Sequence, residues 1–241
     1  IWNTKKSHKG WKTMNGHYHR SSRGGGEWEY RKKLPESWTV SYRDLTFKVS
    51  PTGFKHTGLF PEQAANWDWF SKLIQAEAKK RQSGAGEKIK VLNLFAYTGG
   101  ATIAAAKAGA HVTHVDASKG MVQWAKENAA ASGLAGCPIH WIVDDCAKFI
   151  QREIRRGRRY DGIIMDPPSY GRGPSGEIWK METSFYPFLL ETAKLLTDDP
   201  LFVIINSYTT GLAPSAVGYA SDIVFGAEHG GHTAVGELGL P

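Results

Sequence analysis

The stretch Asp166-Pro167-Pro168-Ser169, which follows a short apolar segment, holds the residues best suited to chemistry. Its adjacent prolines fix φ and remove two backbone donors, so the loop is stiff and its carbonyls can accept hydrogen bonds. Such a loop can grip the edge of a planar base or amide and aim its nitrogen at a methyl donor, while Tyr170 stacks on the base. Because methyl transfer is an in-line displacement, positioning supplies much of the catalysis. A rigid turn without a catalytic role is the competing interpretation.

The second candidate is a glycine-containing turn at Phe95-Ala96-Tyr97-Thr98-Gly99-Gly100. The paired glycines let the backbone turn tightly, and the start of the helix expected next offers N–H groups to an anion. The turn lacks the G-x-G-x-x-G pattern, so it suits a dinucleotide pyrophosphate poorly. A small carboxylate, such as that of a methionine moiety, fits it better.

Acidic residues follow the next two expected strands. Asp116 comes seventeen residues after Gly99, where a carboxylate can accept both hydrogen bonds of a ribose diol. Asp145 can accept from an adenine amino group while the backbone N–H of Cys146 donates to the ring. An aspartate at such a position is also a common helix N-cap, so each residue alone is a weak signal. In this order, and together with the turn, they predict an adenosine-type cofactor.

The elements that must position these residues alternate regularly. The pattern predicts strands at 89–95, 111–115, 139–143, 160–165 and 201–206, and helices at 100–109, 118–132, 146–157, 179–196 and 214–225. Strands separated by helices imply right-handed crossovers and a doubly wound, Rossmann-like α/β fold. Ligands of such a sheet bind beyond the carboxyl ends of its strands, which is where the candidate residues fall. Residues 233–238 offer at most one further strand.

Three segments divide the chain. Residues 1–36 form a basic arm rich in Trp, His and Gly, with a loop or hinge expected at 21–26. Residues 37–86 form a small extension, in which a hairpin of 38–42 and 45–49 turns at Arg43-Asp44 and a helix runs from Pro61 to Ser83-Gly84. Residues 87–241 form the ligand-binding domain.

Charge is concentrated in the arm and extension. The whole chain carries +7, but residues 1–60 carry +8, with twelve Lys and Arg against four Asp and Glu. A basic arm on a neutral body indicates a polyanionic partner, and a solvated tail is the alternative. No apolar stretch approaches the roughly 18 residues of a membrane span. The start of the chain lacks the apolar core of a secretory signal, and two cysteines are too few for a disulfide scaffold, so the cytoplasm is the expected location.

Histidine pairs occur at His17-x-His19 and His229-x-x-His232. Neither pair has a cysteine or carboxylate nearby at a ligand spacing, so no metal site is expected.

Together, these blocks resemble class I S-adenosylmethionine-dependent methyltransferases, most closely the bacterial large-subunit rRNA methyltransferase group. The matching blocks are Leu92–Gly100, Asp116-Ala117-Ser118, Asp145 and Asp166–Ser169. Gly53–Gln63 also resembles that group's G-x-K-T-G-x-F-x-D-Q segment, which lines the cofactor cavity in the family. The resemblance implies S-adenosyl-L-methionine as cofactor, held by Phe60, Gln63, Phe95, Tyr97, Thr98, Gly99, Asp116, Ser118, Asp145, Cys146 and Asp166. A methyltransferase sheet normally ends in two further strands, which leaves open whether the natural chain continues past Pro241.

Departures from the family pattern bear on the substrate. Asn93 and Glu62 replace aspartates, His56 is inserted in the Lys-Thr-Gly run, and the basic arm stands where relatives often carry an RNA-binding domain. The loop after the fifth strand, residues 206–211, lacks the cysteine that C5-pyrimidine methyltransferases need to activate the ring. Methyl transfer to a nitrogen of an RNA base is therefore expected, and oxygen acceptors stay open. Asn206 and Tyr208 are candidate substrate contacts.

Alternatives remain open from the sequence alone. The same cofactor can serve methylation of a protein side chain or a small molecule, because the loop at Asp166 resembles loops that methylate adenine or glutamine amides. The intact Asp166-Pro167-Pro168 argues against a nucleotide-binding module without catalysis. The missing G-x-G-x-x-G pattern argues against an NAD-dependent oxidoreductase. The oligomeric state stays open.

Overall fold

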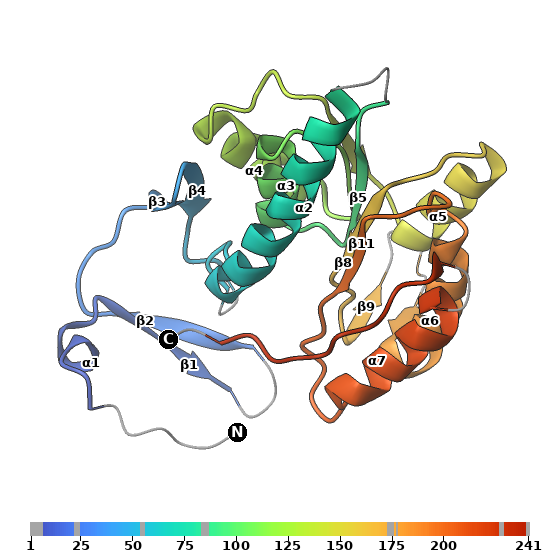
Figure 1. Cartoon of the computed structure of the whole chain (residues 1–241). Coiled ribbons are helices and arrows are strands. Elements are labelled where there is room, and N and C mark those ends of the chain that lie inside the picture. The colour runs from blue at the N-terminus through green and yellow to red at the C-terminus, as the bar shows by residue number, and fades with distance from the viewer. Residues whose placement is uncertain are drawn as a thin grey trace.

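A computed structural model describes residues 7–21, 25–53, 56–82, 87–172, 176, 178–226 and 229–239. Its centre is a parallel sheet with the strand order β11-β8-β5-β6-β7 (Figure 1). These strands are β5 (Lys90–Leu94), β6 (His111–Asp116), β7 (Ile139–Val143), β8 (Gly162–Met165) and β11 (Phe202–Ile205). The chain moves outward from β5 to β7 and then crosses back to β8, so the order reverses between β5 and β8. The doubly wound sheet predicted from the sequence is confirmed.

Helices cover both faces of this sheet, with α2, α3 and α4 on one side and α5 and α6 on the other (Figure 1). The sheet contributes alternate residues of each strand to two cores. Val91 packs with Phe70 of α2 and Ile103 of α3, whereas Leu92 packs with Phe149 of α5 and Leu189 of α6. These helices are α2 (Ala64–Gln82), α3 (Gly100–Lys107), α4 (Lys119–Ala131), α5 (Cys146–Arg155) and α6 (Met181–Ala193). Strands buried on both faces explain why the sequence shows continuous apolar runs there.

The bounds of two predicted helices differ most from those in the structure. The helix expected at 179–196 begins only at Met181, because β10 (Ile178–Lys180) pairs with β9 (Tyr170–Arg172) in a short hairpin. The helix expected at 214–225 is α7 (Pro214–Ser221), followed by a π-helical turn, η2 (Asp222–Gly226).

The strand suggested at 233–238 is wrong, because residues 230–239 have no regular structure. This segment packs on α7 instead: a Cβ added to Gly218 would lie 2.6 Å from Cγ1 of Val235. Among the described residues, no helix has the length and apolarity needed to span a membrane.

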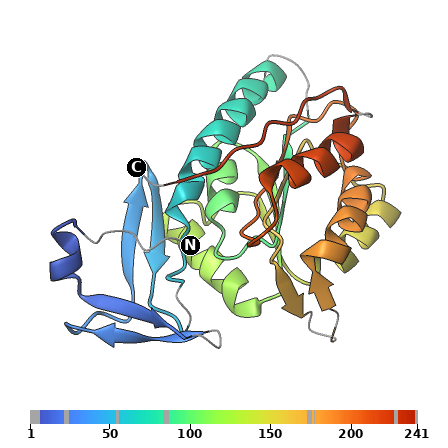
Figure 2. The same cartoon turned by 90° about the horizontal axis from the view of Figure 1, so that it is seen from below.

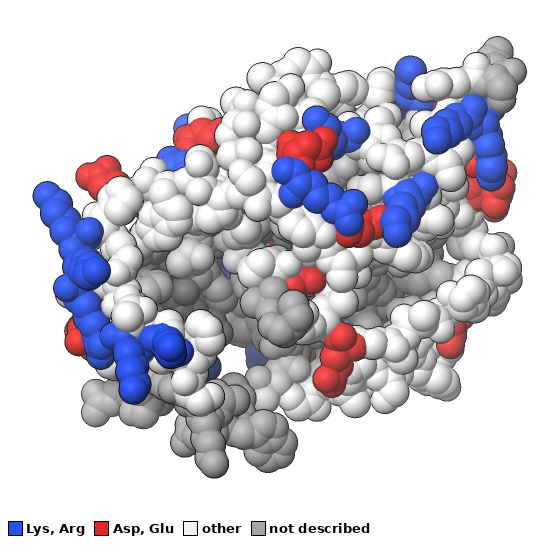
Figure 3. Space-filling model, turned by 60° about the vertical axis from the view of Figure 1, so that its left-hand side comes forward, with Lys and Arg blue, Asp and Glu red and all other residues white. Residues whose placement is uncertain are grey.

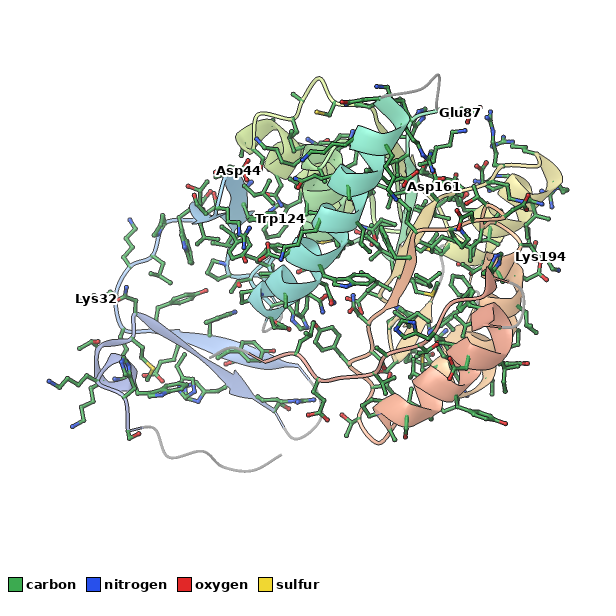
Figure 4. The ribbon with its side chains drawn as sticks, in the orientation of Figure 1. Lys32, Asp44, Glu87, Trp124, Asp161 and Lys194 are labelled. Atoms are coloured by element: carbon green, nitrogen blue, oxygen red, sulfur yellow. The ribbon has the colours of Figure 1, made fainter. Side chains whose placement is uncertain are left out.

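The hairpin and the helix predicted for the extension are present. β3 (Trp38–Tyr42) and β4 (Leu45–Val49) form an antiparallel hairpin, and η1 (Pro61–Gln63) leads into α2. The expected helix end at Ser83-Gly84 lies outside the described residues. At the far end of α2, Arg81 pairs with the buried Asp161 at 2.8 Å, where Asp161 also accepts from the N–H of Lys90 (Figure 4).

Side chains of α4 satisfy the backbone of the outer edge of β4. Ser132 accepts from the N–H of Thr46 and donates to its carbonyl, both at 2.9 Å. One turn earlier, Asn128 accepts from the N–H of Lys48 at 2.7 Å, and the indole of Trp124 donates to the carbonyl of Lys48 at 3.0 Å (Figure 4). A helix whose polar side chains lie at every fourth residue therefore takes the place of a neighbouring strand.

The arm contains a hairpin that the sequence analysis missed. After a single helical turn, α1 (Gly10–Thr13), β1 (Gly16–Arg20) pairs with β2 (Gly26–Tyr30). The rings of Tyr18 and Trp28 lie 5.5 Å apart on one face. The expected loop falls between these strands, and its residues 22–24 lie outside the described residues. Figures 1 and 2 show this hairpin on the side of the extension, beside the carboxyl ends of the sheet.

Candidate functional site

The turn after β5 has an unusual backbone. Phe95 and Tyr97 have φ of +53° and +51°, and Gly99 has φ of +82° at the N-cap of α3. A Cβ on Gly99 would lie 2.9 Å from Cβ of Ala125, so only glycine fits there. A positive φ costs free energy at any residue other than glycine, and residues held in this conformation are concentrated at ligand-binding sites. The turn points the first N–H groups of α3 toward the carboxyl edge of the sheet, as an anion site requires.

Thr98 fixes this turn to the extension through its hydroxyl group. Its side chain is 2% exposed and donates to the carbonyl of Gly58 at 2.6 Å. Gly58 in turn lies against α4, where a Cβ would come within 2.3 Å of Trp124. The segment 56–60 is thereby held against the turn, while Phe54 and Lys55 of the family-like motif lie outside the described residues.

Asp116 ends β6 beside the turn. Its carboxylate accepts from the N–H of Tyr97 and from the N–H of Ser118, both at 2.8 Å. Burial raises the pKa of Asp116, and the two backbone hydrogen bonds oppose that shift. A carboxylate can accept about four hydrogen bonds. The two backbone N–H groups use two of these positions, so about two remain for the hydroxyls of a diol.

Asp145 and Cys146 begin α5 at the end of β7. Asp145 is the N-cap of this helix and accepts from the N–H of Lys148 at 2.9 Å. Cys146 is buried, and its sulfur accepts from the N–H of Phe95 at 3.3 Å. Burial raises the pKa of this thiol, so it is a poor nucleophile. Both N-cap and ligand roles remain compatible for Asp145, because one helix bond leaves acceptor positions on its carboxylate.

A cavity at the carboxyl edge brings several predicted residues together. Its lining comes from Leu59, Phe60, Trp67, Asn93, Phe95, Ala96, Tyr97, Thr98, Gly100, Ala101, Ile164, Asp166 and Asn206. Asp116, Ser118 and Asp145 do not line this cavity but lie at the ends of the next strands, β6 and β7. A ligand that reaches from the cavity to Asp116 and Asp145 would therefore have to be elongated, with its polar groups at the same spacing as these strands.

Asp166 lies between this cavity and the loop that follows β8. Its backbone N–H donates to the carbonyl of Leu94 at 3.3 Å, which continues the pairing of β8 with β5. Burial, with the negative charge of Glu62 second, raises the pKa of Asp166 to about 7. A carboxyl group with such a pKa exists in both protonation states near neutral pH and suits acid–base chemistry.

Residues outside the loop Asp166–Ser169 hold this loop in place by hydrogen bonds. The indole of Trp179 donates to the carbonyl of Pro168 at 2.6 Å, the hydroxyls of Ser169 and Thr209 lie 2.8 Å apart, and the N–H of Met181 donates to the carbonyl of Ser169 at 3.1 Å. Sequence reasoning missed Trp179, because its position was assigned to a helix. Tyr170 is 52% exposed at the start of β9, where it is accessible to a partner.

Polar contacts connect the extension to the loop after β11 at the mouth of the cavity. The hydroxyl of Tyr208 accepts from Gln63 at 2.9 Å and donates to Glu62 at 2.8 Å. Asn66 donates to Asn206 at 3.1 Å. The ring of Phe60 lies 5.3 Å from the ring of Tyr208 and 5.7 Å from that of Tyr97. The structure thus groups the predicted Phe60, Gln63, Asn206 and Tyr208, and adds Glu62 and Asn66.

Comparisons with known proteins agree with this geometry. The family described as S-adenosylmethionine-dependent methyltransferase matches residues 4–196. The chain is 38% identical to a SAM-dependent methyltransferase from Agrobacterium tumefaciens, with a TM-score of 0.80 over 87% of this chain and 64% of that one. A putative methyltransferase complexed with SAH shares the fold, with a TM-score of 0.73 at 23% identity over 90% of this chain and 53% of that one.

Curated relatives are similar over a shorter part. The chain is 34% identical over 163 residues to the ribosomal RNA large subunit methyltransferase K/L of Shewanella frigidimarina, and 32% identical over 164 residues to that of Colwellia psychrerythraea. These matches cover 67% and 68% of this chain. The chain spans about a fifth of the length of these relatives, 21% and 20%.

Proposed function

The chain belongs to the S-adenosylmethionine-dependent methyltransferase family, and from that premise we propose that it methylates a nitrogen atom of an RNA base. The observation that carries this proposal is the position of Asp166. It lies at the end of β8, lines the cavity beside the turn after β5, and has a pKa raised to about 7.

The residues present fit the family's cofactor. The N–H groups at the start of α3 would hold its carboxylate, Asp116 would accept from the ribose hydroxyls, and Asp145 would accept from the adenine amino group. The strained backbone at Phe95 and Tyr97, with Asp116 held by two backbone N–H groups, supports this assignment. When bound, S-adenosylmethionine supplies an electrophilic methyl group.

The chain's own contribution is to orient the acceptor and accept its proton. The Asp166 carboxylate would accept a hydrogen bond from an N–H of the base, which directs the nitrogen lone pair toward the cavity. The carbonyl of Pro168 already accepts from Trp179, so the carbonyl of Pro167 is the better candidate for a second hydrogen bond. After transfer, the methylated nitrogen has one proton to lose, and an Asp166 with a pKa near 7 can take it.

The two thiols of the chain support nitrogen over carbon as the acceptor. Addition to C6 of a pyrimidine needs a reactive thiolate beside the base. Cys146 is buried behind Phe95 with a raised pKa, and Cys137 precedes β7, while the loop after β11 has Asn206, Ser207 and Tyr208. Transfer to nitrogen needs no such group.

RNA as substrate is supported by the arm and by the relatives, whose names specify ribosomal RNA. Exposed cations of the arm are Lys9, Lys12, Arg20, Arg31, Lys32 and Lys33. Figure 3 shows basic residues gathered along one side of the molecule. Lys32 extends outward from this edge (Figure 4). Cations in this arrangement bind phosphates with little sequence preference and leave specificity to the site. The cytoplasmic location expected from the sequence remains a prediction.

Transfer of a labelled methyl group separates RNA from the other acceptor classes. Purified protein is incubated with labelled S-adenosylmethionine and, separately, rRNA, ribosomal protein and a small-molecule extract. We expect label in RNA with the wild type and at least tenfold less with Asp166→Asn. Label only in protein or in small molecules would contradict an RNA substrate without contradicting the family assignment.

The arm is tested by the triple variant Lys9→Glu, Lys32→Glu and Lys33→Glu. We expect weaker RNA binding and a salt dependence reduced by about one unit of slope per lost phosphate contact. The matched control reverses three exposed lysines elsewhere, Lys79, Lys88 and Lys126. Equal effects of the two variants would show that only net charge matters and would remove the arm from the proposal.

A further inference from the structure

The hairpin of the arm has two chemically different faces. Side chains two residues apart on a strand share a face, so His17 and His19 point the same way from β1. The register pairs His17 with Glu29 and His19 with Glu27, which brings both glutamates to that same face. Tyr18 and Trp28, which pair with each other, lie on the opposite face.

This pairing corrects the sequence-based expectation that no carboxylate accompanies the two histidines. One ligand atom from each of His17, His19 and Glu29 can be chosen so that all three lie within 4.8 Å of one another. Nε2 of His19 lies 2.6 Å from Oε2 of Glu29, and the two imidazole rings have centroids 4.3 Å apart. Residues separated in sequence by a turn are thus arranged around one point.

We propose that His17, His19 and Glu29 bind a zinc ion on the outer face of the hairpin. Two imidazoles and one carboxylate form a ligand set that zinc accepts, with water completing a tetrahedral site. A tetrahedral zinc ion at about 2.0–2.2 Å from each donor needs donors about 3.4 Å apart. The three donor atoms already lie within 4.8 Å of one another, so rotation of these side chains brings them to that spacing. Glu27, in register with His19, shares this face of the hairpin but is not one of the three residues whose ligand atoms lie within 4.8 Å of one another.

Such an ion would cross-link β1 and β2. An isolated two-stranded hairpin is marginally stable in water, and this one pairs through five residues on each strand. Metal bound between the strands adds its binding free energy to the folded hairpin, because the unfolded arm has no preformed site. None of the three proposed ligands lines the cavity at Asp166, so zinc would order the arm without taking part in methyl transfer.

Calorimetric titration of the full chain with zinc chloride, after removal of metal with a chelator, tests this proposal. We expect one ion per chain with micromolar affinity. Each of His17→Gln, His19→Gln and Glu29→Gln should raise Kd at least tenfold, whereas His140→Gln, which removes an exposed histidine of β7, should leave it unchanged.

Cobalt provides a second measurement that does not depend on folding of the variants. Cobalt bound to the wild type should show the intense visible absorption of a four- or five-coordinate site, and zinc should abolish it by competition. No binding by the wild type, or equal zinc binding by all variants, would overturn the proposal. Equal binding would indicate a site elsewhere, for example at Cys137, which every variant retains.

Discussion

The side-chain amide of Asn128 donates to the carbonyl of Thr98 at 2.9 Å, and its oxygen accepts from the N–H of Lys48 at 2.7 Å. One buried side chain in α4 therefore connects the extension to the turn that would hold the cofactor. Thr98 completes the connection through its own hydrogen bond to Gly58. The extension is in this way part of the site's support.

Replacing Asn128 with leucine should lower stability and cofactor affinity together. The change leaves a buried N–H and a buried carbonyl without partners, at about 1–3 kcal/mol each. We expect the free energy of unfolding in urea to fall by about 2–4 kcal/mol. Calorimetry should show weaker S-adenosylmethionine binding. Lys126→Leu, at an exposed position of the same helix, is the control; an equal loss in that variant would refute the bridging role.

Asp116→Ala should abolish measurable cofactor binding while the protein stays folded. The variant removes the acceptor of the ribose hydroxyls and also frees the N–H groups of Tyr97 and Ser118 that orient the turn. Asp116→Asn retains one oxygen acceptor, so we expect an intermediate Kd, at least tenfold above the wild type. Calorimetric titration with S-adenosylmethionine measures both. Unchanged affinity in the alanine variant would show that Asp116 serves only as a structural acceptor.

The pKa of Asp166 predicts two pH dependences of opposite direction. Its folded-state pKa of about 7 lies above the ordinary aspartate value of 3.8. Between these values the folded state binds the extra proton, so this group's contribution to stability falls as pH rises from about 4 to 7. Activity should rise over pH 6 to 8, because the ionised carboxylate is the hydrogen-bond acceptor and base.

Chemical denaturation and kcat/KM, each measured from pH 5 to 9, check these dependences. Asp166→Asn should flatten the stability profile, whereas Asp198→Asn, at an exposed position, should leave it unchanged. A wild-type rate profile without an inflection between pH 6 and 8 would exclude Asp166 as the titrating group.

Trp179→Phe should reduce turnover more than stability. Phenylalanine keeps a ring beside Phe95 and Phe188, whose centroids lie 5.3 Å and 5.2 Å from that of Trp179, but loses the hydrogen bond to Pro168. We expect the free energy of unfolding to fall by about 1 kcal/mol. We expect kcat to fall roughly tenfold, because the loop that positions the acceptor is held less firmly. Trp69→Phe, an exposed tryptophan of α2, is the control. A similar kcat in both variants would indicate that Trp179 only packs.

The sequence predicted the central sheet well, because strands buried on both faces appear as apolar runs such as the one ending at Met165. The residues at the strand ends follow from that topology. The sequence analysis missed β1 and β2 although their residues alternate between polar and aromatic types. Each strand has only five residues, and only their pairing places Tyr18 against Trp28. β9 and β10 are too short for a periodic signal.

Long-range contacts could not be read from local patterns. Nothing near Asn128 in the sequence indicates partners at Lys48 and Thr98, which lie 80 and 30 residues away. The same is true of Tyr208 and Glu62, which are 146 residues apart and meet at the mouth of the cavity. Such contacts depend on how the extension packs against the sheet. The family resemblance placed only Phe60 and Gln63 of the extension at the cavity.

The most direct test of the central claim is to identify the methylated atom. RNA methylated by the wild-type protein with labelled S-adenosylmethionine is digested to nucleosides and analysed by mass spectrometry against standards. We expect label on a base nitrogen, and at least tenfold less label when Asp166→Asn is used. Label on C5 of a pyrimidine or on a ribose oxygen, or no label in RNA, would contradict the central claim.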